Sequence, residues 1–448
     1  MKAKMLLLSL ALAGAPAFGA DLLQMYREAL TYDAQYDAAK SALEAGREKL
    51  PQGRAGLLPT ISGTANTTHN DVDFEQRASG ATQSSARYNS SGYQVSLTQP
   101  LFRWQNFMQY QQGKLQVVQA EAQFAQAKQD LALRVSQAYF DSLLAQESLA
   151  LAGAQKKAIG EQLEQAKRNF EVGTATITDS NEAQARFDLT TAQEIAAEND
   201  LEIKRQALNQ VIGKVPDVLK GLRPQVQLQR PQPDDMTKWV EAAEQNNPLV
   251  AVQQAALEIA DREVGKQRAG HYPTIDLVAA RGRNSNTGAL AFGGIAAGTA
   301  IPGSDTTSTT VGLQLNLPIF AGGATASRDR EAVALRDKAR ADLDNVRRSA
   351  AQSARQAYLG ATSGMSQVKA YEQALISSQS ALDSNKLGYE VGVRINIDVL
   401  NAQQQLYSTR RDLAKAYFDT LLAQLRLKAA AGTLGEEDIQ AINALLVQ

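Results

Sequence analysis

One phrase of the sequence occurs twice in this chain, and the repeat limits what the chain can fold into. The first copy, FEVGTATITDSNEAQ, runs from Phe170 to Gln184, and the second, YEVGVRINIDVLNAQ, runs from Tyr389 to Gln403, 219 residues later. Three shorter pairs fit the same alignment: RAGLLPTI and RAGHYPTI, LTQPLF and LNLPIF, and QAYF and QAYL, at offsets of 214, 218 and 219 residues. Because the offset changes so little, we interpret the chain as a tandem duplication whose halves fold alike.

The repeat also predicts the domain organisation. We expect a first structural repeat over residues 20–213, a second over 235–432, a proline-rich linker over 214–234 and a carboxyl-terminal segment over 433–448. The linker contains four prolines, Pro216, Pro224, Pro231 and Pro233. Proline cannot continue a helix, so extended or turn structure is predicted there.

The first twenty residues, MKAKMLLLSLALAGAPAFGA, have the pattern of a secretory signal peptide: two lysines, a short apolar run and small residues. We expect cleavage after Gly19 or Ala20 and assign residues 1–19 to the signal peptide. An uncleaved anchor is disfavoured because the run is too short for a bilayer core of about 30 Å and Pro16 interrupts it. The exported chain is then periplasmic, secreted or a β-barrel.

Composition argues against several functions. Lys and Arg number 46 against 47 Asp and Glu, without long runs of one sign, so no nucleic-acid partner is expected. Cysteine is absent, which excludes disulfides, thiolate metal sites and cysteine nucleophiles. The two histidines, His69 and His271, are interpreted as bystanders, and no calcium or phosphate-binding loop has the required spacing. The sequence therefore predicts no enzyme, no cofactor and no metal site.

Each repeat contains two predicted β-strands. They begin after Pro59 and Pro273, and the segments YQVSLTQPLF and VGLQLNLPIF alternate apolar with polar residues. The polar stretches HNDVDFEQRASGATQSS and NSNTGALAFGGIAAGTAIPGSD are expected to be the loops that join the strands. Helical segments are expected before the strands, over 21 to about 54 and 235 to about 268.

A long proline-free run rich in Ala, Gln and Leu follows each strand pair, from about Trp104 to Phe170 and from Ala324 to Tyr389. As a single helix each run would measure about 100 Å and would need partners along its length. Second helices, over 179 to about 212 and 398 to about 431, are predicted to return antiparallel to them. The fold class is therefore mixed α and β.

Four strands per chain cannot close a barrel, and an open sheet edge is not tolerated in lipid because its amides stay unpaired. If the strands contact the lipid bilayer, two or more chains must pool them, and the sequence alone does not choose between dimer and trimer. Four aromatic residues near the strand ends suit an interfacial girdle: Phe102, Trp104, Phe107 and Phe320. Ordinary core packing is the alternative for each of them.

The strand starts LLPTI and YPTI, the strand ends QPLF and LPIF, the long helices and the paired EVG…D…AQ phrases together resemble the TolC-type outer membrane channel family. The similarity covers the whole mature chain. It implies a homotrimer in the outer membrane of a Gram-negative bacterium. Twelve strands, four per chain, would form one β-barrel that continues into a long periplasmic α-helical barrel.

The resemblance also implies a function, that of the exit duct of a tripartite system. An inner membrane transporter, of the ATP-binding cassette or proton-driven type, would supply the energy, and a periplasmic adaptor would dock at the hairpin tips. Proteins exported by type I secretion, small toxic compounds or both would pass through. The competing interpretation is a periplasmic coiled-coil adaptor or scaffold without a pore, which explains the helices and export but not the paired strands.

The repeated phrase itself predicts a helix–turn–helix corner. Gly173 and Gly392 tolerate the positive φ of a helix stop, and Asp179 and Asp398 stand where a carboxylate caps the returning helix. Each corner lies at the end of its hairpin farthest from the strands, which would be the periplasmic mouth.

The resemblance assigns further roles at this corner. Tyr389, Arg394, Thr178 and Asp179 match the positions that close the family's tunnel. Asp398 matches one of two aspartate rings that select cations, whereas Asn401 stands at the position of the other. We therefore expect weaker cation selectivity and weaker block by cations than two rings would give.

Overall fold

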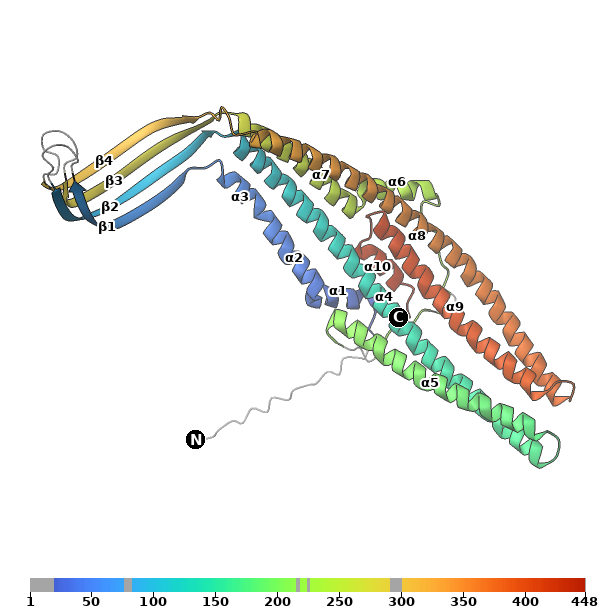
Figure 1. The fold of residues 1–448 in the computed structure, drawn as a ribbon. Coiled ribbons are helices and arrows are strands. Elements are labelled where there is room, and N and C mark those ends of the chain that lie inside the picture. The colour runs from blue at the N-terminus through green and yellow to red at the C-terminus, as the bar shows by residue number, and fades with distance from the viewer. Residues whose placement is uncertain (1–19, 76–82, 215–217, 224–225, 291–299, 448) are drawn as a thin grey trace, which may run out of the picture. The chain divides into compact units, whose positions relative to one another are not determined.

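The computed structural model describes residues 20–75, 83–214, 218–223, 226–290 and 300–447 (Figure 1). The predicted signal peptide lies outside these residues. The chain divides into two compact units. One unit contains the chain up to Ser41, Gln123–Val250 and Val346 onward, and the other contains Ala42–Ala122 and Ala251–Asn345.

The second unit contains an antiparallel sheet in which the strands follow one another in chain order. These strands are β1 (Thr60–Glu75), β2 (Gln83–Phe102), β3 (Thr274–Leu290) and β4 (Ala300–Asn316). Strands β1 and β3 begin directly after Pro59 and Pro273, as the sequence predicts. Within the described residues, β1 and β4 each pair on one side only, so the sheet has two open edges.

The strands are longer than the sequence predicts. The segments expected to be loops from His69 and Asn284 onward continue as strand to Glu75 and Leu290, and only residues 76–82 and 291–299 lie outside the described chain. Polar side chains pair across the strands there. His69 bonds Asn89 at 2.7 Å, and an ion pair of 3.1 Å joins Arg87 to Asp71. These pairs replace the apolar alternation on which the strand prediction depended.

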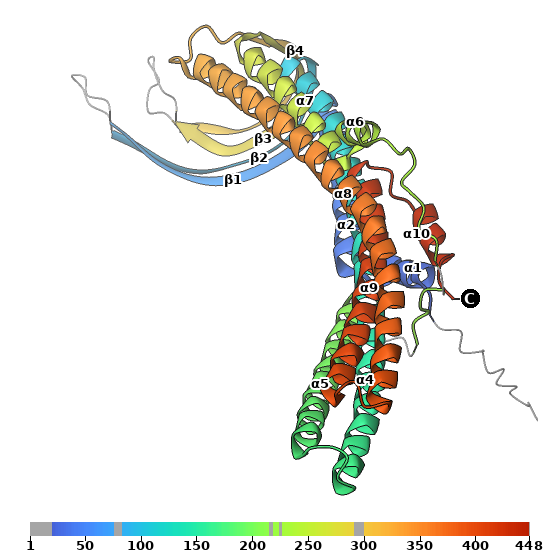
Figure 2. The ribbon, with the colours of Figure 1, turned by 90° about the vertical axis from the view of Figure 1, so that its right-hand side faces the viewer.

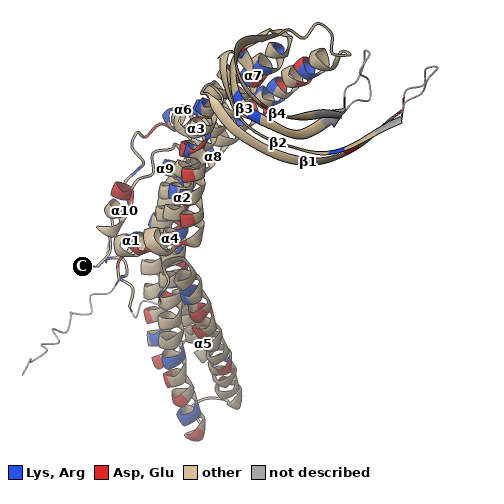
Figure 3. Cartoon of the chain, turned by 90° about the vertical axis from the view of Figure 1, so that its left-hand side faces the viewer, with Lys and Arg blue, Asp and Glu red and all other residues tan. Residues whose placement is uncertain are grey.

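The sheet has one apolar and one polar face, because alternate residues of a strand point to opposite sides. We call the first the apolar face; its residues include Ile61, Val95, Leu97, Leu277, Ala279, Val311, Leu313 and Leu315. The opposite, polar face consists mainly of Ser, Thr, Asn and Gln, for example Thr60, Ser62, Thr64, Gln94, Ser96 and Gln314. Charged residues are sparse on the strands and frequent along the helices (Figure 3).

A buried ion pair fixes the inner end of the sheet. Arg103, which follows β2, donates two hydrogen bonds of 2.7 and 2.6 Å to the carboxylate of Asp276 on β3. Asp276 is buried, so this bidentate pair satisfies a carboxylate that would otherwise be costly to bury. Helix α3 (Lys49–Ala55) packs closely on the long helix that begins at Trp104, and a Cβ at Gly113 would lie 2.6 Å from the carbonyl oxygen of Lys49.

Two helical hairpins lie in the first unit, apart from the beginnings of their long helices, which belong to the second unit (Figure 2). Helices α4 (Trp104–Glu171) and α5 (Ile177–Ile212) form one, and α8 (Ala324–Glu390) and α9 (Asn396–Ala430) form the other. Both long runs are uninterrupted helices, as predicted. Helix α5 contacts α9, so the two hairpins lie side by side. No helix within the described ranges has both the length and the apolar character needed to cross a membrane.

The main core of the first unit lies where short helices cover the hairpins. Helices α1 (Leu22–Tyr32) and α10 (Glu436–Asn443) pack there against α4 and α9 around Tyr139, Phe140 and Phe418. The linker is held at Lys220, whose carbonyl accepts a hydrogen bond of 2.7 Å from the Tyr139 hydroxyl. Helix α6 (Met236–Asn246) places Trp239 against Leu427 of α9.

The helical segments before the strands are broken, where the sequence analysis expected continuous helices. Asp33 separates α1 from α2 (Ala34–Arg47), because its carboxylate accepts hydrogen bonds from the Tyr36 amide at 2.7 Å and from Arg134 at 2.9 Å. In the second half, Asn247 separates α6 from α7 (Pro248–Arg268), where proline is suited to the first position of a helix. The breaks recur at the same offset of 214 residues.

Candidate functional site at the hairpin corners

Both hairpins turn in the same way. Gly173 and Gly392 have φ values of 79° and 77°, a conformation that side chains other than glycine rarely adopt. The carbonyl of Asn169 accepts hydrogen bonds from the amides of Thr174 and Ala175, and the carbonyl of Gly388 accepts from those of Val393 and Arg394. The last carbonyls of α4 and α8 are thereby satisfied, which ends both helices at the predicted glycines.

The returning helix of the first hairpin is capped as predicted. The Thr176 hydroxyl accepts from the Asp179 amide at 3.3 Å, while the Asp179 carboxylate accepts from the Thr176 amide at 2.9 Å. This reciprocal pair is a capping box, which satisfies two amides that the helix itself leaves free. Thr178 is exposed and makes no hydrogen bond within the described part of the chain.

The second hairpin differs, and the prediction of an equivalent side-chain cap by Asp398 is wrong. Ile395 occupies the position of Thr176 and makes no side-chain capping bond. Asp398 remains in the first turn of α9, where the helix dipole favours a carboxylate. Its carboxylate lies 3.6 Å from the guanidinium of Arg394, an exposed pair within one corner.

Polar bonds join the two hairpins near their corners. The Tyr389 hydroxyl accepts a hydrogen bond of 3.1 Å from the Asn169 amide group, and Gln162 donates one of 2.6 Å to the buried Asn396. At the aligned positions, copy one has Asn169 and Phe170 where copy two has Gly388 and Tyr389. The donor, Asn169, therefore lies in the first sequence repeat and the acceptor, Tyr389, in the second, so the two corners of one chain complement each other. Within the chain, the Tyr389 hydroxyl bonds Asn169 and makes no bond to the predicted gate residue Asp179 in the described residues.

A further contact, which the sequence analysis missed, lies two turns into the returning helices. Arg186 on α5 donates hydrogen bonds of 2.6 Å to Gln404 and 2.9 Å to Asn401 on α9. The sequence held one sign of this contact: Arg186 of the first repeat aligns with an uncharged residue, Gln405, in the second repeat. The Asn401 side chain therefore already accepts a hydrogen bond from the Arg186 guanidinium of its own chain.

Between α8 and α9 lies an open polar depression of about 620 Å³. Arg394, Asp398 and Asn401 line it together with Ser378 and Gln405. Its one arginine and one aspartate suit weak attraction of ions more than tight chelation. In the portion of the chain that the structure describes, no three His, Asp or Glu side chains gather to hold a metal ion.

A second cavity, of about 380 Å³, lies beside the linker and has Glu147, Arg410 and Tyr417 in its wall. Burial raises the pKa of Glu147. Burial, and secondarily the hydrogen bond of 2.5 Å to Glu372, raises the pKa of the Tyr417 hydroxyl. The hydrogen bond between Tyr417 and Glu372 joins α9 to α8.

The four aromatic residues of the predicted girdle all belong to the second unit. Phe320 is 86 % exposed and Phe102 is 41 % exposed, and the rings of Trp104 and Phe107 lie 5.1 Å apart at the start of α4. Their exposure is unlike that of core aromatics such as Phe140, which is 1 % exposed. The sheet end where they cluster is the end attached to the helices.

Comparisons with known proteins agree with this architecture. The family model described as outer membrane efflux protein matches residues 25–214 and 239–433. The chain is 34% identical to the alkaline protease secretion protein AprF of Pseudomonas aeruginosa, over 96% of this chain and 88% of that protein. It is 32% identical to the outer membrane protein TolC of Escherichia coli, over 95% of this chain and 85% of that protein.

Among solved structures, the outer membrane protein VceC of Vibrio cholerae is similar in fold, with a TM-score of 0.77 at 19% identity over 92% of this chain and 96% of that chain. The match of the family model extends over most of both halves, including both corners. The chain therefore belongs to the outer membrane efflux protein family.

Proposed function

We propose that three copies of this chain form the exit duct of a tripartite export system, located in the outer membrane and extending into the periplasm. The sheet carries this proposal. It has an apolar face, a polar face and two edges that are open in the described chain. In a bilayer, each unpaired edge amide or carbonyl would cost several kcal/mol.

Closure by copies of the same chain removes both edges. Strand β4 of one copy pairs antiparallel with β1 of the next, which continues the up-and-down order already present within the chain. Bacterial single-chain barrels begin at about 8 strands, so four strands per chain require at least two copies. Family membership favours three, which gives a barrel of twelve strands.

The faces of the sheet assign the inside and the outside of this barrel. The apolar face contacts lipid, and the exposed Val311, Leu313 and Leu315 suit that environment. The polar face, rich in Ser, Thr, Asn and Gln, lines a water-filled lumen. Phe102, Trp104, Phe107 and Phe320 then lie at the periplasmic interface as an aromatic girdle. Nothing in such a duct supplies energy, so transport through it is passive.

The corners form the periplasmic gate in this proposal. Tyr389 and Arg394 hold the second hairpin inward, with Asp179 and Thr178 as the acceptors offered by a neighbouring copy's first hairpin. Support comes from the exposure of Arg394 and Thr178, which leaves them accessible to another copy. Three Asp398 carboxylates around the axis favour cations, and Asn401 adds no charge, so the selectivity is weaker than that of two aspartate rings.

Partners and cargo follow from the relatives. An inner membrane transporter, of the ATP-binding cassette or proton-driven type, delivers the cargo, and a periplasmic adaptor docks at the corners. Relatives that secrete proteases favour protein cargo. The competing scaffold without a pore gives no role to a two-faced sheet with open edges.

Single-channel recording in planar bilayers tests the proposal. The wild type should form small cation-preferring channels, and the double variant Tyr389→Phe, Arg394→Ser should conduct several-fold more, because it removes a hydroxyl and a guanidinium from the gate. A matched control is Arg411→Ser, an exposed arginine on α9 farther from the corner that pairs with the adjacent Asp412 at 3.6 Å. Absence of channels from wild-type protein that migrates as a heat-resistant trimer would refute the duct. Equal conductance in all three would move the gate away from these residues.

A further inference from the structure

Two arginines interrupt the apolar face of the sheet. Arg281 and Arg283 alternate along β3 with the same period as Leu277 and Ala279, so all four side chains share one face. Charged side chains on the lipid side of a barrel are costly at the middle of the bilayer and nearly free of cost at its boundary. Their level along the strand therefore decides what they do.

The arginines lie at the outer boundary of the apolar face. Arg283 pairs in register with Tyr93, and nine residues separate Tyr93 from Phe102 at the inner end of β2. At about 3.3 Å per residue and a tilt of about 40°, that distance spans roughly 23 Å along the membrane normal. An apolar band of a barrel measures about 25 Å, so Tyr93 and Arg283 stand at its far margin, where the outer leaflet's headgroups lie.

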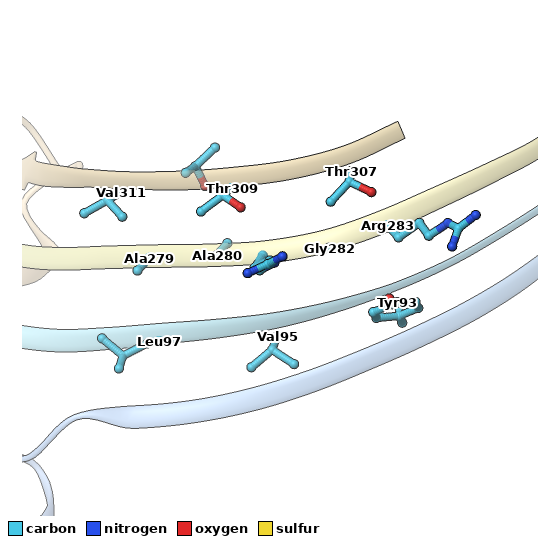
Figure 4. A pocket seen from close by; sticks show the side chains of 12 residues that line it. Tyr93, Val95, Leu97, Ala279, Ala280, Gly282, Arg283, Thr307, Thr309 and Val311 are labelled. Atoms are coloured by element: carbon cyan, nitrogen blue, oxygen red, sulfur yellow. The ribbon is translucent and has the colours of Figure 1, made fainter. Parts of the chain in front are cut away.

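Hydroxyl donors flank both arginines. The register places Thr309 and Thr307 of β4 opposite Arg281 and Arg283, and Tyr93 on the other side of Arg283. Together they line a groove of about 550 Å³ whose inner part is apolar (Figure 4). Figure 4 shows Val95, Leu97, Ala279 and Val311 continuing this surface toward the inner end of the strands.

The groove carries net positive charge. Arg283 pairs with Asp305 at 2.8 Å, and both side chains remain about half exposed. Arg281 is exposed and has no hydrogen-bond or ion-pair partner within the described residues. One aspartate against two arginines leaves an uncompensated guanidinium beside several hydroxyl groups, which is the donor set that recognises phosphate.

We propose that this groove binds a phosphate-bearing lipid of the outer leaflet. The phosphate accepts charge-assisted hydrogen bonds from Arg281 and Arg283, with the hydroxyls of Thr307 and Thr309 as further donors. The acyl chains lie on Val95, Leu97, Ala279 and Val311, and the arginine stems follow the same apolar surface while their guanidinium groups reach the headgroup. This inference rests on the proposed function, because the apolar face meets lipid only in the membrane-embedded barrel.

Native mass spectrometry of the purified full-length trimer tests the site. The probes are hexaacyl lipid A with both phosphates and the same lipid with both phosphates removed. For the wild type we expect retention of the phosphorylated probe and at least tenfold weaker retention of the dephosphorylated one. The double variant Arg281→Gln, Arg283→Gln should lose about tenfold in affinity for the phosphorylated lipid and bind the two probes equally.

Arg87→Gln is the matched control, because Arg87 lies on the same face but farther out, paired with Asp71. It should retain the phosphorylated lipid like the wild type. Equal retention by wild type and double variant, or equal binding of both probes by the wild type, would overturn the lipid site. Channel recordings distinguish failure of the lipid site from failure of the proposed duct. A double variant that conducts normally but no longer retains the phosphorylated lipid supports the site. A wild type that conducts but binds both lipid probes equally rejects the lipid site and leaves the duct in place.

Discussion

Arg186 offers the most direct test of how the hairpins are held together. Its guanidinium donates hydrogen bonds of 2.6 and 2.9 Å from α5 to Gln404 and Asn401 of α9. A hydrogen bond from a charged group contributes about 1.5–3 kcal/mol when buried, and water reduces this to about 0.5–1 kcal/mol at an exposed site. The two bonds therefore stabilise the contact between α5 and α9 by about 1–2 kcal/mol per chain.

If the proposed trimer opens as one body by separating α5 from α9 in every chain, three such contacts break together. They contribute about 3–6 kcal/mol, so Arg186→Gln should raise the ratio of open to closed channels by a factor of about 10²–10⁴. Single-channel recording measures that ratio as open probability. If the chains open one at a time, Arg186→Gln should still raise the ratio of open to closed chains, by a factor of about 5–30 for each chain.

The control is Arg205→Gln. The Arg205 side chain lies on the same helix and makes no hydrogen bond or ion pair in the described part of the chain, so this variant removes the same charge without breaking a contact. An open probability that rises equally in both variants would show that charge, not the bridge, matters. If Arg186→Gln opens no more often than wild type, the reasoning from these two bonds is refuted.

Three further outcomes are expected. Asn401→Asp should raise cation preference, measured as the reversal potential in a KCl gradient, by less than Asp398→Asn lowers it, because the Arg186 guanidinium 2.9 Å away would neutralise the new carboxylate. Thr176→Val should destabilise the start of α5 by about 1 kcal/mol, visible as faster amide hydrogen exchange there, since it removes a helix cap. Burial raises the pKa of Tyr26 to about 12, so its contribution to stability is complete below pH 10 and is lost as the pH rises toward 12. Unfolding in guanidinium chloride at pH 9 and pH 11 should show a loss of stability that is about 1 kcal/mol smaller in Tyr26→Phe than in the wild type.

Much of the fold was predictable because it depends on local and periodic signals. Pro59 and Pro273 marked the strand starts, and Gly173 and Gly392 marked the helix ends, since both residue types restrict or permit specific backbone angles. The outer parts of the strands were missed because pairs such as His69 with Asn89 hold them through polar bonds, which leave no apolar alternation in the sequence.

The candidate site was predictable in its position and not in its bonds. The repeated phrase located both corners, but Tyr389 bonds Asn169 and Arg186 bonds Asn401, across 220 and 215 residues of sequence. No spacing rule connects such pairs, because they depend on how α5 and α9 pack. The comparison of the two repeats held one usable signal: Asn169, Tyr389 and Arg186, which bond across the two hairpins, each differ from the residue at the aligned position of the other repeat.

The same comparison distinguishes the mechanics of the two corners. The first corner closes its returning helix with a capping box between Thr176 and Asp179, whereas Ile395 leaves the second without a side-chain cap. A missing cap costs about 1 kcal/mol, so the start of α9 is the easier of the two to rearrange. Asp398, freed from capping, is then available to Arg394 and to ions on the axis of the proposed trimer. The two duplicated corners therefore differ in how firmly their returning helices begin, and Arg394 and Asp398 stand on the corner that lacks the side-chain cap.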